Sequence, residues 1–272
     1  MIEDWAWTPV AGLFGLAVGS FLNVCSLRWP REESVVSPPS RCPGCGEGVR
    51  WYDNIPVLSW LVLRGKCRWC HEPISIQYPV VEATTALVWA GVVYVHGPSW
   101  EAFRGGLFLT LLFGISLSDA RFYIIPDEFS IGGTVLGLAA AFAPGGIGWI
   151  EAFTGAAAGY LSLWVVAVGG TWVMKRFFPG RLEEAGVDQA MGGGDIKMMM
   201  MVGAFVGAWG VVETVFLGSV LALIVFGPMA AFSKRLIPLG VFLAAAGAVA
   251  YGWGDALVVW YLTAVVGLPP QG

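Results

Sequence analysis

The sequence predicts an all-α polytopic membrane protein with about eight transmembrane helices and a small cytoplasmic domain inserted after the first helix. Hydrophobic residues make up 57% of the 272 residues, charged residues only 12%, and the mean hydropathy is +0.71. That much apolar surface is typical of chains that cross a membrane repeatedly, so we expect the lipid bilayer to surround most of the chain. The basic residues form no long run and no stripe interleaved with aromatic residues, so nucleic-acid binding is not expected.

Eight apolar segments account for the predicted helices. They lie at about 8–27, 79–96, 103–119, 128–143, 150–174, 196–210, 212–232 and 237–253. Several are shorter than the roughly 20 residues that a perpendicular transmembrane helix needs, so their boundaries are approximate. The stretch 255–267 either extends the last helix after a glycine break or lies at the membrane interface. Glycines spaced four apart predict close helix packing; the pairs are Gly15/Gly19, Gly133/Gly137, Gly155/Gly159 and Gly203/Gly207.

The distribution of basic residues orients the predicted helices. The first apolar segment follows acidic residues and precedes basic ones, the reverse of a cleavable signal peptide, so we predict a retained helix with its N-terminus outside. Eight spans then place all basic residues but one on the cytoplasmic side, in agreement with the positive-inside rule. These residues are Arg28, Arg31, Arg41, Arg50, Arg64, Lys66, Arg68, Arg121, Lys175, Arg176, Arg181, Lys197, Lys234 and Arg235, and Arg104 is the exception.

One polar, proline-rich segment divides the chain into three predicted parts. We expect a first transmembrane helix at 1–27, a cytoplasmic domain at 28–78 and a membrane-embedded domain at 79–272. The cytoplasmic segment contains a weak internal repeat, "CPGCGEGVRWY" from residue 42 and "CRWCHEPISIQY" from residue 67. Each copy begins with C-x-x-C, which indicates two similar turns.

Cys42, Cys45, Cys67 and Cys70 form the pattern C-x2-C-x21-C-x2-C within this segment. Two close thiolate pairs are typical of tetrahedral zinc, and four thiolates complete the coordination, so we expect a structural site in a small zinc-binding domain. Two disulfides are the alternative, but the orientation above places the segment in a reducing cytosol. A segment of about 50 residues has little core, and bound Zn²⁺ would supply folding free energy. His71, beside Cys70, is a possible substitute ligand.

Three aspartates at the predicted cytoplasmic ends of helices are candidates for chemistry. Asp119 and Asp127 flank the turn after the third segment, and Asp195 follows the glycines at 192–194. Ionisable groups at such positions are costly and are therefore functional candidates. Two carboxyl groups held close together share a proton, so one can act as base on water while the other polarises a carbonyl. The glycines permit positive φ and the approach of a substrate backbone. The alternative is a flexible loop before an aspartate that the helix dipole favours.

The sequence resembles the prepilin leader peptidases, or type IV prepilin peptidases, which belong to the G-x-G-D membrane aspartyl proteases. The resemblance covers nearly the whole chain and rests on several motifs in the same order. They are "GSFLNVCSLRWP", "SRCPGCG", "WYDNIPVLSWLVLRGKCRWC", "PISIQYPVVEATTAL", "SDARFYIIPDEFSI", "GYLSLW" and "MGGGDIKMMMMVGAFVG". The chain departs from the family pattern at His71, where glycine is common, and in "IPLGVF", where "PFGP" is frequent.

This resemblance implies a bacterial enzyme of the inner, or cytoplasmic, membrane. Such enzymes cleave the leader peptide from type IV prepilins and pseudopilins at the cytoplasmic membrane face, in type IV pilus and type II secretion systems. Many also methylate the new N-terminal amine with S-adenosylmethionine as methyl donor. Those enzymes carry the cysteine-rich cytoplasmic domain, which is intact in this sequence, so the resemblance favours both activities.

The resemblance also assigns roles to particular residues. Asp119, in "DARFYIIP", and Asp195 correspond to the catalytic pair. The residues before Asp195 that complete the G-x-G-D element are Gly192, Gly193 and Gly194. Asp127 is a rival, but related enzymes can carry asparagine there, which suggests that it caps the next helix. Lys197 is expected to extend to the interface or to tune the pair. The candidates for methyl transfer are Asp53, Asn54 and Gly65.

Two other classes of function fit parts of the sequence. An ion- or proton-coupled transporter with a regulatory zinc domain would also hold carboxylates in the membrane, but it would be expected to show repeated halves and helices broken near the midplane. A non-catalytic scaffold that recruits partners through the zinc module gives no reason for paired acids behind glycines. The sequence therefore favours the enzyme.

Overall fold

A computed structural model describes residues 4–184, 186–230 and 238–267. Over these residues the chain is helical, and its only β pairing consists of two isolated bridges, between Arg41 and Gly48 and between Lys66 and Pro73. The chain divides into two compact units, Met1–Thr110 and Leu111–Gly272. The prediction of an all-α fold is confirmed for the part of the chain that the structure covers.

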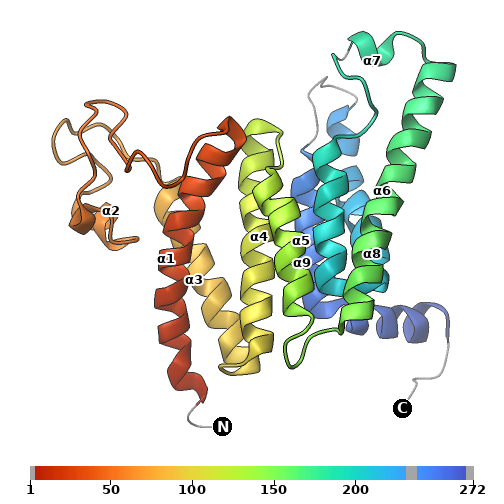
Figure 1. The fold of residues 1–272 in the computed structure, drawn as a ribbon, viewed down its shortest axis with the longest axis horizontal. Helices are drawn as coiled ribbons and strands as arrows, with labels where there is room; N and C mark the ends of the chain where they lie inside the picture. The colour runs from red at the N-terminus through yellow and green to blue at the C-terminus, as the bar shows by residue number, and fades with distance from the viewer. Residues whose placement is uncertain (1–3, 185, 231–237, 268–272) are drawn as a thin grey trace. The chain divides into compact units, whose positions relative to one another are not determined.

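The first unit is built on a pair of long helices, α1 (Trp7–Arg28) and α3 (Gln77–His96). The two helices pack closely at Gly15, which has no side chain. A Cβ atom there would lie only 2.7 Å from the Cα of Ala86. Between α1 and α3 lies a polar segment with little regular structure. Its short helices are η2 (Trp29–Arg31), η3 (Trp51–Asp53) and α2 (Leu58–Val62), and η1 (Asp4–Ala6) precedes α1 (Figure 1). The helix α4 (Trp100–Phe122) begins in the first unit and ends in the second.

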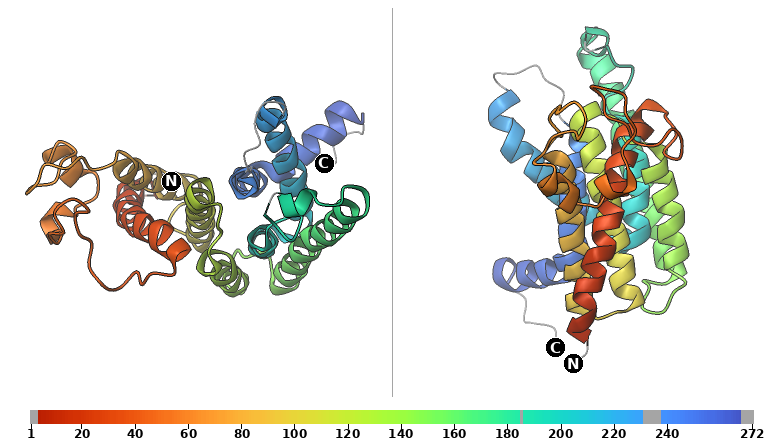
Figure 2. Two further views of the ribbon diagram at one scale, coloured as in Figure 1. Left: turned by 90° about the horizontal axis from the view of Figure 1, so that it is seen from above. Right: turned by 90° about the vertical axis from the view of Figure 1, so that its left-hand side faces the viewer.

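The second unit is arranged around α8 (Gly193–Ala230), which contacts α5, α6 and α9 (Figures 1 and 2). The remaining elements are α5 (Asp127–Ala140), α6 (Trp149–Phe177), α7 (Arg181–Glu184), α9 (Leu239–Trp260) and the π-helical turn η4 (Tyr261–Val265). The methionines Met198, Met199 and Met201 of α8 are fully buried, so they form part of the core of this unit.

Glycines bring α6 and α8 into backbone contact. A Cβ atom on Gly155 would collide with the carbonyl of Gly203, and one on Gly159 would collide with the carbonyl of Met199. The predicted role of these glycine pairs in close helix packing is thus confirmed here.

A kink divides α8 at Gly207, where φ is 74° and ψ is 179°. Only glycine adopts this backbone conformation readily. The kink separates two helical stretches, but it lies inside the apolar segment predicted at 196–210 and not at the predicted boundary between 210 and 212. A Cβ atom at Gly207 would also lie 2.8 Å from Oε1 of Glu151 on α6.

Five helices within the described residues are long and apolar enough to cross a membrane, or six if one bent pair counts as a span. The five are Trp7–Arg31, Gln77–His96, Trp100–Phe122, Trp149–Phe177 and Gly193–Phe226, and the bent pair is Leu239–Gly254 with Ala256–Val265. The chain is therefore an integral membrane protein, whereas the number of eight spans stays a prediction, because α5 has only 14 residues and the two stretches of α8 count together as one of the five candidate spans. Lys234 and Arg235 lie outside the described residues.

Candidate metal centre and aspartate site

The four cysteines of the first unit form one compact cluster. Their Sγ atoms all lie within 4.8 Å of one another, with Cys42 and Cys70 separated by 3.6 Å and Cys45 and Cys67 by 4.0 Å. Tetrahedral Zn²⁺ with Zn–S bonds of about 2.3 Å requires sulfur–sulfur separations of about 3.8 Å. The sulfur positions therefore fit a tetrahedral metal ion.

The cluster is held by two equivalent turns, one in each copy of the predicted repeat. The N–H of Cys42 donates to the carbonyl of Glu47 at 2.9 Å, and the N–H of Cys67 donates to the carbonyl of Glu72 at the same distance. In the second turn, backbone N–H groups, first that of Cys70 and then that of Trp69, bond the Cys67 sulfur and lower its pKa to about 7. A thiol with this pKa is readily available as a thiolate ligand.

The residue after each C-x-x-C adopts a left-handed backbone. It is Gly46 in the first turn, with φ of 73°, and His71 in the second, with φ of 58°. Among the described residues, the group able to hold a metal consists of the four cysteines and does not include His71. His71 stands where glycine is common in the family that the sequence resembles. It thus occupies a backbone conformation that glycine adopts more easily.

The three candidate methyl-transfer residues have different surroundings in the first unit. Asp53 forms a bidentate ion pair with Arg68, with Arg68 Nε 2.8 Å from Asp53 Oδ2, and these hydrogen bonds lower the pKa of Asp53. Gly65 has φ of 66°, and a Cβ atom there would lie 2.8 Å from the ring of Trp60. Asn54 is exposed. Asp53 and Gly65 therefore support the local fold, and Asn54 is accessible to a ligand.

Asp119 lies in the second unit near the C-terminal end of α4 and is only 6% exposed. Its Oδ2 atom accepts the N–H of Val241 at 3.2 Å. A Cβ atom on Gly240 would lie 2.8 Å from the same oxygen, so the backbone at the start of α9 approaches the carboxyl group closely. The amino end of a helix stabilises a negatively charged carboxylate through its free N–H groups.

Asp195 lies in the first turn of α8, directly after Gly194, which approaches Ile125 in the turn between α4 and α5. Asp195 and Asp119 are close enough for their charges to interact. Ile125 of this turn packs against the starts of α8 and α9: a Cβ atom on Gly194 would lie 3.0 Å from the Ile125 Cβ, and one on Gly240 would lie 2.9 Å from its Cδ1. The structure thus places near each other the two aspartates that the family resemblance assigns to the catalytic pair.

The three glycines before Asp195 do not have positive φ, contrary to one reason we gave for their presence. Two of the glycines do allow neighbouring atoms to come close to the backbone. A Cβ atom on Gly192 would lie 3.2 Å from Asp195 Oδ2, and Gly194 packs against Ile125. A Cβ atom on Gly193 would have no neighbour within 4 Å. One side of the loop is therefore packed and the other is open.

Asp127 and Lys197 form an ion pair beside this site. Lys197 Nζ lies 2.7 Å from Oδ1 and 2.9 Å from Oδ2 of Asp127. Asp127 is the first residue of α5, as expected, but the hydrogen bonds of its carboxylate go to Lys197 and no side-chain cap bond is formed at this helix end. Lys197 likewise points to Asp127 and is not extended alone toward the interface. The pair joins the amino ends of α5 and α8.

Sequence reasoning missed two contributors to these regions. The first is the backbone at Gly240 and Val241, for which the glycine close to a proline in "IPLGVF" was the available signal. The second is Glu82 in α3, a carboxylate within an apolar segment that is only 7% exposed and whose Oε2 accepts the Val57 N–H at 2.7 Å. An acid in the middle of "YPVVEATTAL" would have identified it.

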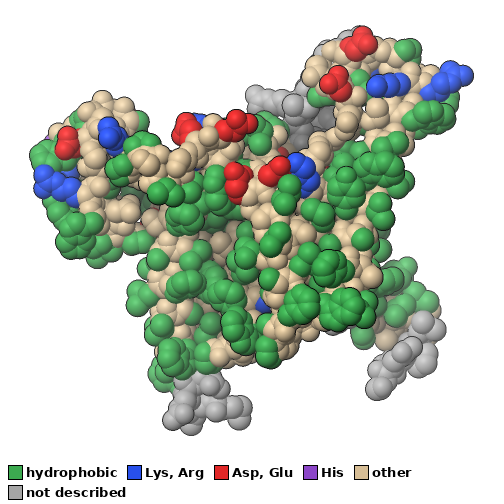
Figure 3. Space-filling view, in the orientation of Figure 1, with side chains coloured by type: hydrophobic (Ala, Val, Ile, Leu, Met, Phe, Trp, Pro, Cys, Tyr) green, Lys and Arg blue, Asp and Glu red, His purple; other side chains and the backbone are tan. Residues whose placement is uncertain are grey.

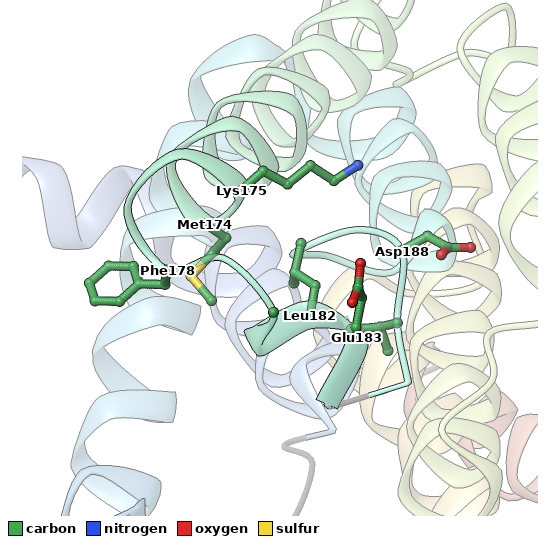
Figure 4. A pocket seen from close by; sticks show the side chains of 8 residues that line it. Met174, Lys175, Phe178, Leu182, Glu183 and Asp188 are labelled. Atoms are coloured by element: carbon green, nitrogen blue, oxygen red, sulfur yellow. The ribbon is translucent and has the colours of Figure 1, made fainter.

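A small pocket in the second unit lies at the C-terminal end of α6 (Figure 4). Its lining includes Lys175, Glu183 and Asp188 together with the apolar side chains of Met174, Phe178, Leu182 and Val187. None of these residues belongs to the aspartate site. Charged side chains gather on α7 and this end of α6, whereas hydrophobic side chains dominate the lower part of α6 (Figure 3).

Comparison with known proteins assigns both parts of the chain to one class of membrane peptidase. Residues 13–96 match the bacterial peptidase A24 N-terminal domain, and residues 106–227 match the type IV leader peptidase family. No solved structure shows a significant match.

Several relatives bear the name prepilin leader peptidase/N-methyltransferase. The one from Xanthomonas campestris is 33% identical, with 93% of this chain and 94% of that protein aligned, and the one from Pseudomonas aeruginosa is 35% identical, with 92% and 91% aligned. A relative from Myxococcus xanthus is 38% identical over 71% of this chain, which spans about half (54%) of that longer protein. The chain therefore belongs to the prepilin leader peptidase/N-methyltransferase family.

Proposed function

We propose that this protein is a membrane aspartic endopeptidase that removes the leader peptide from type IV prepilins and pseudopilins. The observation that carries the proposal is that Asp119, bonded by the amino end of α9, and Asp195, at the start of α8, lie close enough for their charges to interact. The names of the full-length relatives point to the same activity.

The surroundings of the two aspartates suggest separate roles. The Val241 N–H holds the carboxyl group of Asp119 in place, and we therefore assign Asp119 as the group that removes a proton from water while Asp195 donates a hydrogen bond to the scissile carbonyl. The water oxygen bonds to the carbonyl carbon, the C–N bond breaks, and a proton passes to the leaving amine. The products are a leader peptide with a new carboxylate and a pilin with a new N-terminal amine.

The open side of the G-x-G-D element provides a place for the substrate. Gly193 has no neighbour within 4 Å of the position of a Cβ atom, so an extended peptide backbone can lie against it and present its carbonyl to Asp195. We place this reaction at the cytoplasmic face of the bacterial inner membrane, with residues 28–78 in the cytoplasm and the N-terminus outside, because nearly all basic residues then lie inside.

We propose further that residues 28–78 form a zinc-binding domain that takes part in N-methylation of the new terminus, with the protease domain at 79–272. Cys42, Cys45, Cys67 and Cys70 would hold Zn²⁺ as a structural ion, because four thiolates leave no open coordination position. S-adenosylmethionine, when bound, supplies a methyl group on a positively charged sulfur, which the free amine can attack. Exposed Asn54 is the candidate for contact with the donor, while Asp53 and Gly65 maintain the local fold.

The test is to incubate the purified full-length protein in lipid with a prepilin and to read product masses with and without S-adenosylmethionine. We expect leader removal in both reactions and the added mass of one methyl group only with the donor. An intact prepilin in both reactions would contradict the peptidase, and cleavage without any methyl addition would contradict the second activity alone.

Replacing either aspartate tests the pair directly. Asp119→Asn and Asp195→Asn should each lower the cleavage rate by at least about 100-fold, because an amide can neither accept the proton of water nor share a proton with its partner. Asp188→Asn, in the separate pocket of the same unit, is the matched control and should cleave at the unaltered rate. Cleavage by the Asp195 variant at the original rate would refute the mechanism.

A further inference from the structure

The short helix α2 presents apolar side chains outward. Leu58, Leu61 and Val62 are 54%, 58% and 67% exposed, and these three side chains together form the α2 face. Ser59 points inward, where its hydroxyl donates to the Tyr52 carbonyl at 3.0 Å and accepts the Ile55 N–H at 2.9 Å. A polar inner side with an apolar outer side is the reverse of a helix that faces water.

The contact between Val57 and Glu82 sets the depth of α2 relative to α3. Val57 directly precedes α2, and its N–H donates to the buried Glu82 carboxylate. The 20 residues of α3 make about 30 Å of helix, which equals the thickness of the hydrocarbon core of a bilayer. Glu82 follows Gln77, the first residue of α3, by roughly 7–8 Å along the axis. In Figure 1, α2 accordingly lies level with the upper turns of α1 and not above them.

Basic residues follow the α2 face directly. Arg64 and Lys66 are exposed, and both have long side chains that can extend from an apolar surface to the phosphates of lipid headgroups. Hydrophobic side chains also gather at the lower edge of the domain that carries α2 (Figure 3). Depth, exposed apolar groups and flanking positive charge together match a segment that lies in the plane of the membrane interface.

We propose that the α2 face is inserted into the adjoining lipid leaflet, so that the cysteine-containing domain is held to the membrane surface at a third point besides α1 and α3. The occupant of the face is lipid: acyl chains contact Leu58, Leu61 and Val62, and Arg64 and Lys66 bind anionic headgroups. Glu82 couples this docking to the membrane helices, because it bonds the backbone where α2 begins.

The experiment uses the full-length protein in nanodiscs of phosphatidylethanolamine and phosphatidylglycerol. A fluorescent amino acid replaces Leu61 in one variant and Val62 in a second, and the control carries it at Val36. Val36 is 87% exposed and apolar, but it follows the acidic residues Glu32 and Glu33. Lipids with a nitroxide on an upper acyl carbon are then added as quenchers, and the metal content of each variant verifies that the domain is folded.

We expect blue-shifted emission at Leu61 and Val62, with quenching by the nitroxide lipid at least about threefold stronger than at Val36. Emission as in water with no quenching at both test positions would overturn the proposal. Blue-shifted emission without lipid quenching would also overturn it, because protein would then cover the α2 face. Quenching at Val36 as strong as at Leu61 and Val62 would also overturn the proposal, since contact with the membrane would then not be specific to α2.

Discussion

At the scale of single residues, the adjacent glycines Gly193 and Gly194 allow the two proposed functions of the G-x-G-D element to be separated. A Cβ atom on Gly194 would press against Ile125, whereas one on Gly193 would meet no atom within 4 Å. Gly194→Ala should shift Asp195 relative to Asp119 and lower kcat by about 10- to 100-fold. Gly193→Ala should leave kcat nearly unchanged and raise KM, because its methyl group occupies the proposed path of the substrate.

Steady-state cleavage of a prepilin by the two glycine variants provides the measurement. The pair serves as its own control, since the same methyl group is added at neighbouring positions. Unaltered kinetics for Gly194→Ala would show that the contact with Ile125 does not position Asp195. Unaltered KM for Gly193→Ala would show that the substrate does not lie against the open side of the loop.

His71 is a second residue whose effect depends on backbone conformation. It occupies a left-handed position with φ of 58°, which corresponds to Gly46 in the first turn. A left-handed conformation costs a residue with a side chain about 1–2 kcal/mol, so His71→Gly should slow the release of metal to a chelator, and Gly46→Ala should accelerate it. Both variants should bind the same amount of zinc as the original protein. Loss of the metal from His71→Gly would instead identify the imidazole as a ligand.

At the scale of helices, the ion pair of Asp127 and Lys197 joins the amino ends of α5 and α8. Both side chains are substantially exposed, 54% and 38% respectively, and such pairs contribute at most about 1 kcal/mol. Asp127→Asn should therefore lower the cleavage rate by less than about fivefold, and Lys197→Met should have a similarly limited effect. A loss of activity by Asp127→Asn as large as that of Asp195→Asn would make Asp127 a member of the catalytic pair.

The helices themselves could be predicted well because apolar runs and glycine spacing depend on local sequence. The glycines of α6 and α8 are correctly predicted as packing positions. The kink at Gly207, by contrast, lies inside the segment predicted at 196–210, because a local pattern does not show the backbone conformation of a single glycine. The number of spans could not be predicted in the same way. A helix of 14 residues such as α5 is too short to be assigned to a full span by its length, and α2 is too short to give a periodic signal.

At the scale of the whole molecule, the sequence predicts the chemical type of each site residue and its depth in the membrane. Asp119, Asp127 and Asp195 are candidates because all three lie at the predicted cytoplasmic face, and the family resemblance selects Asp119 and Asp195 as the pair. The four cysteines are candidates because of their spacing. The contacts of Val241 with Asp119, of Lys197 with Asp127 and of Glu82 with Val57 join residues 122, 70 and 25 positions apart. Such pairs depend on how the helices pack, which no local pattern encodes.

The cysteine cluster and the aspartate pair belong to different compact units, and this separation makes a prediction about their independence. Cys42→Ala removes one of four thiolates, and the remaining three hold zinc much more weakly, so the metal content should fall and residues 28–78 should lose their ordered turns. Methylation should be lost, while cleavage should continue because Asp119 and Asp195 keep their surroundings. Product masses and zinc content, measured on the same preparation, check both expectations.

The matched control is Cys25→Ala, since Cys25 is a buried cysteine of α1 outside the cluster. This variant should keep its zinc and both activities. Treatment of the original protein with a chelator should reproduce the Cys42→Ala pattern without any substitution, because removing the ion takes away the bridge between the two turns. Equal loss of cleavage and methylation in both experiments would mean that the peptidase needs the folded zinc domain. The two activities would then not be independent.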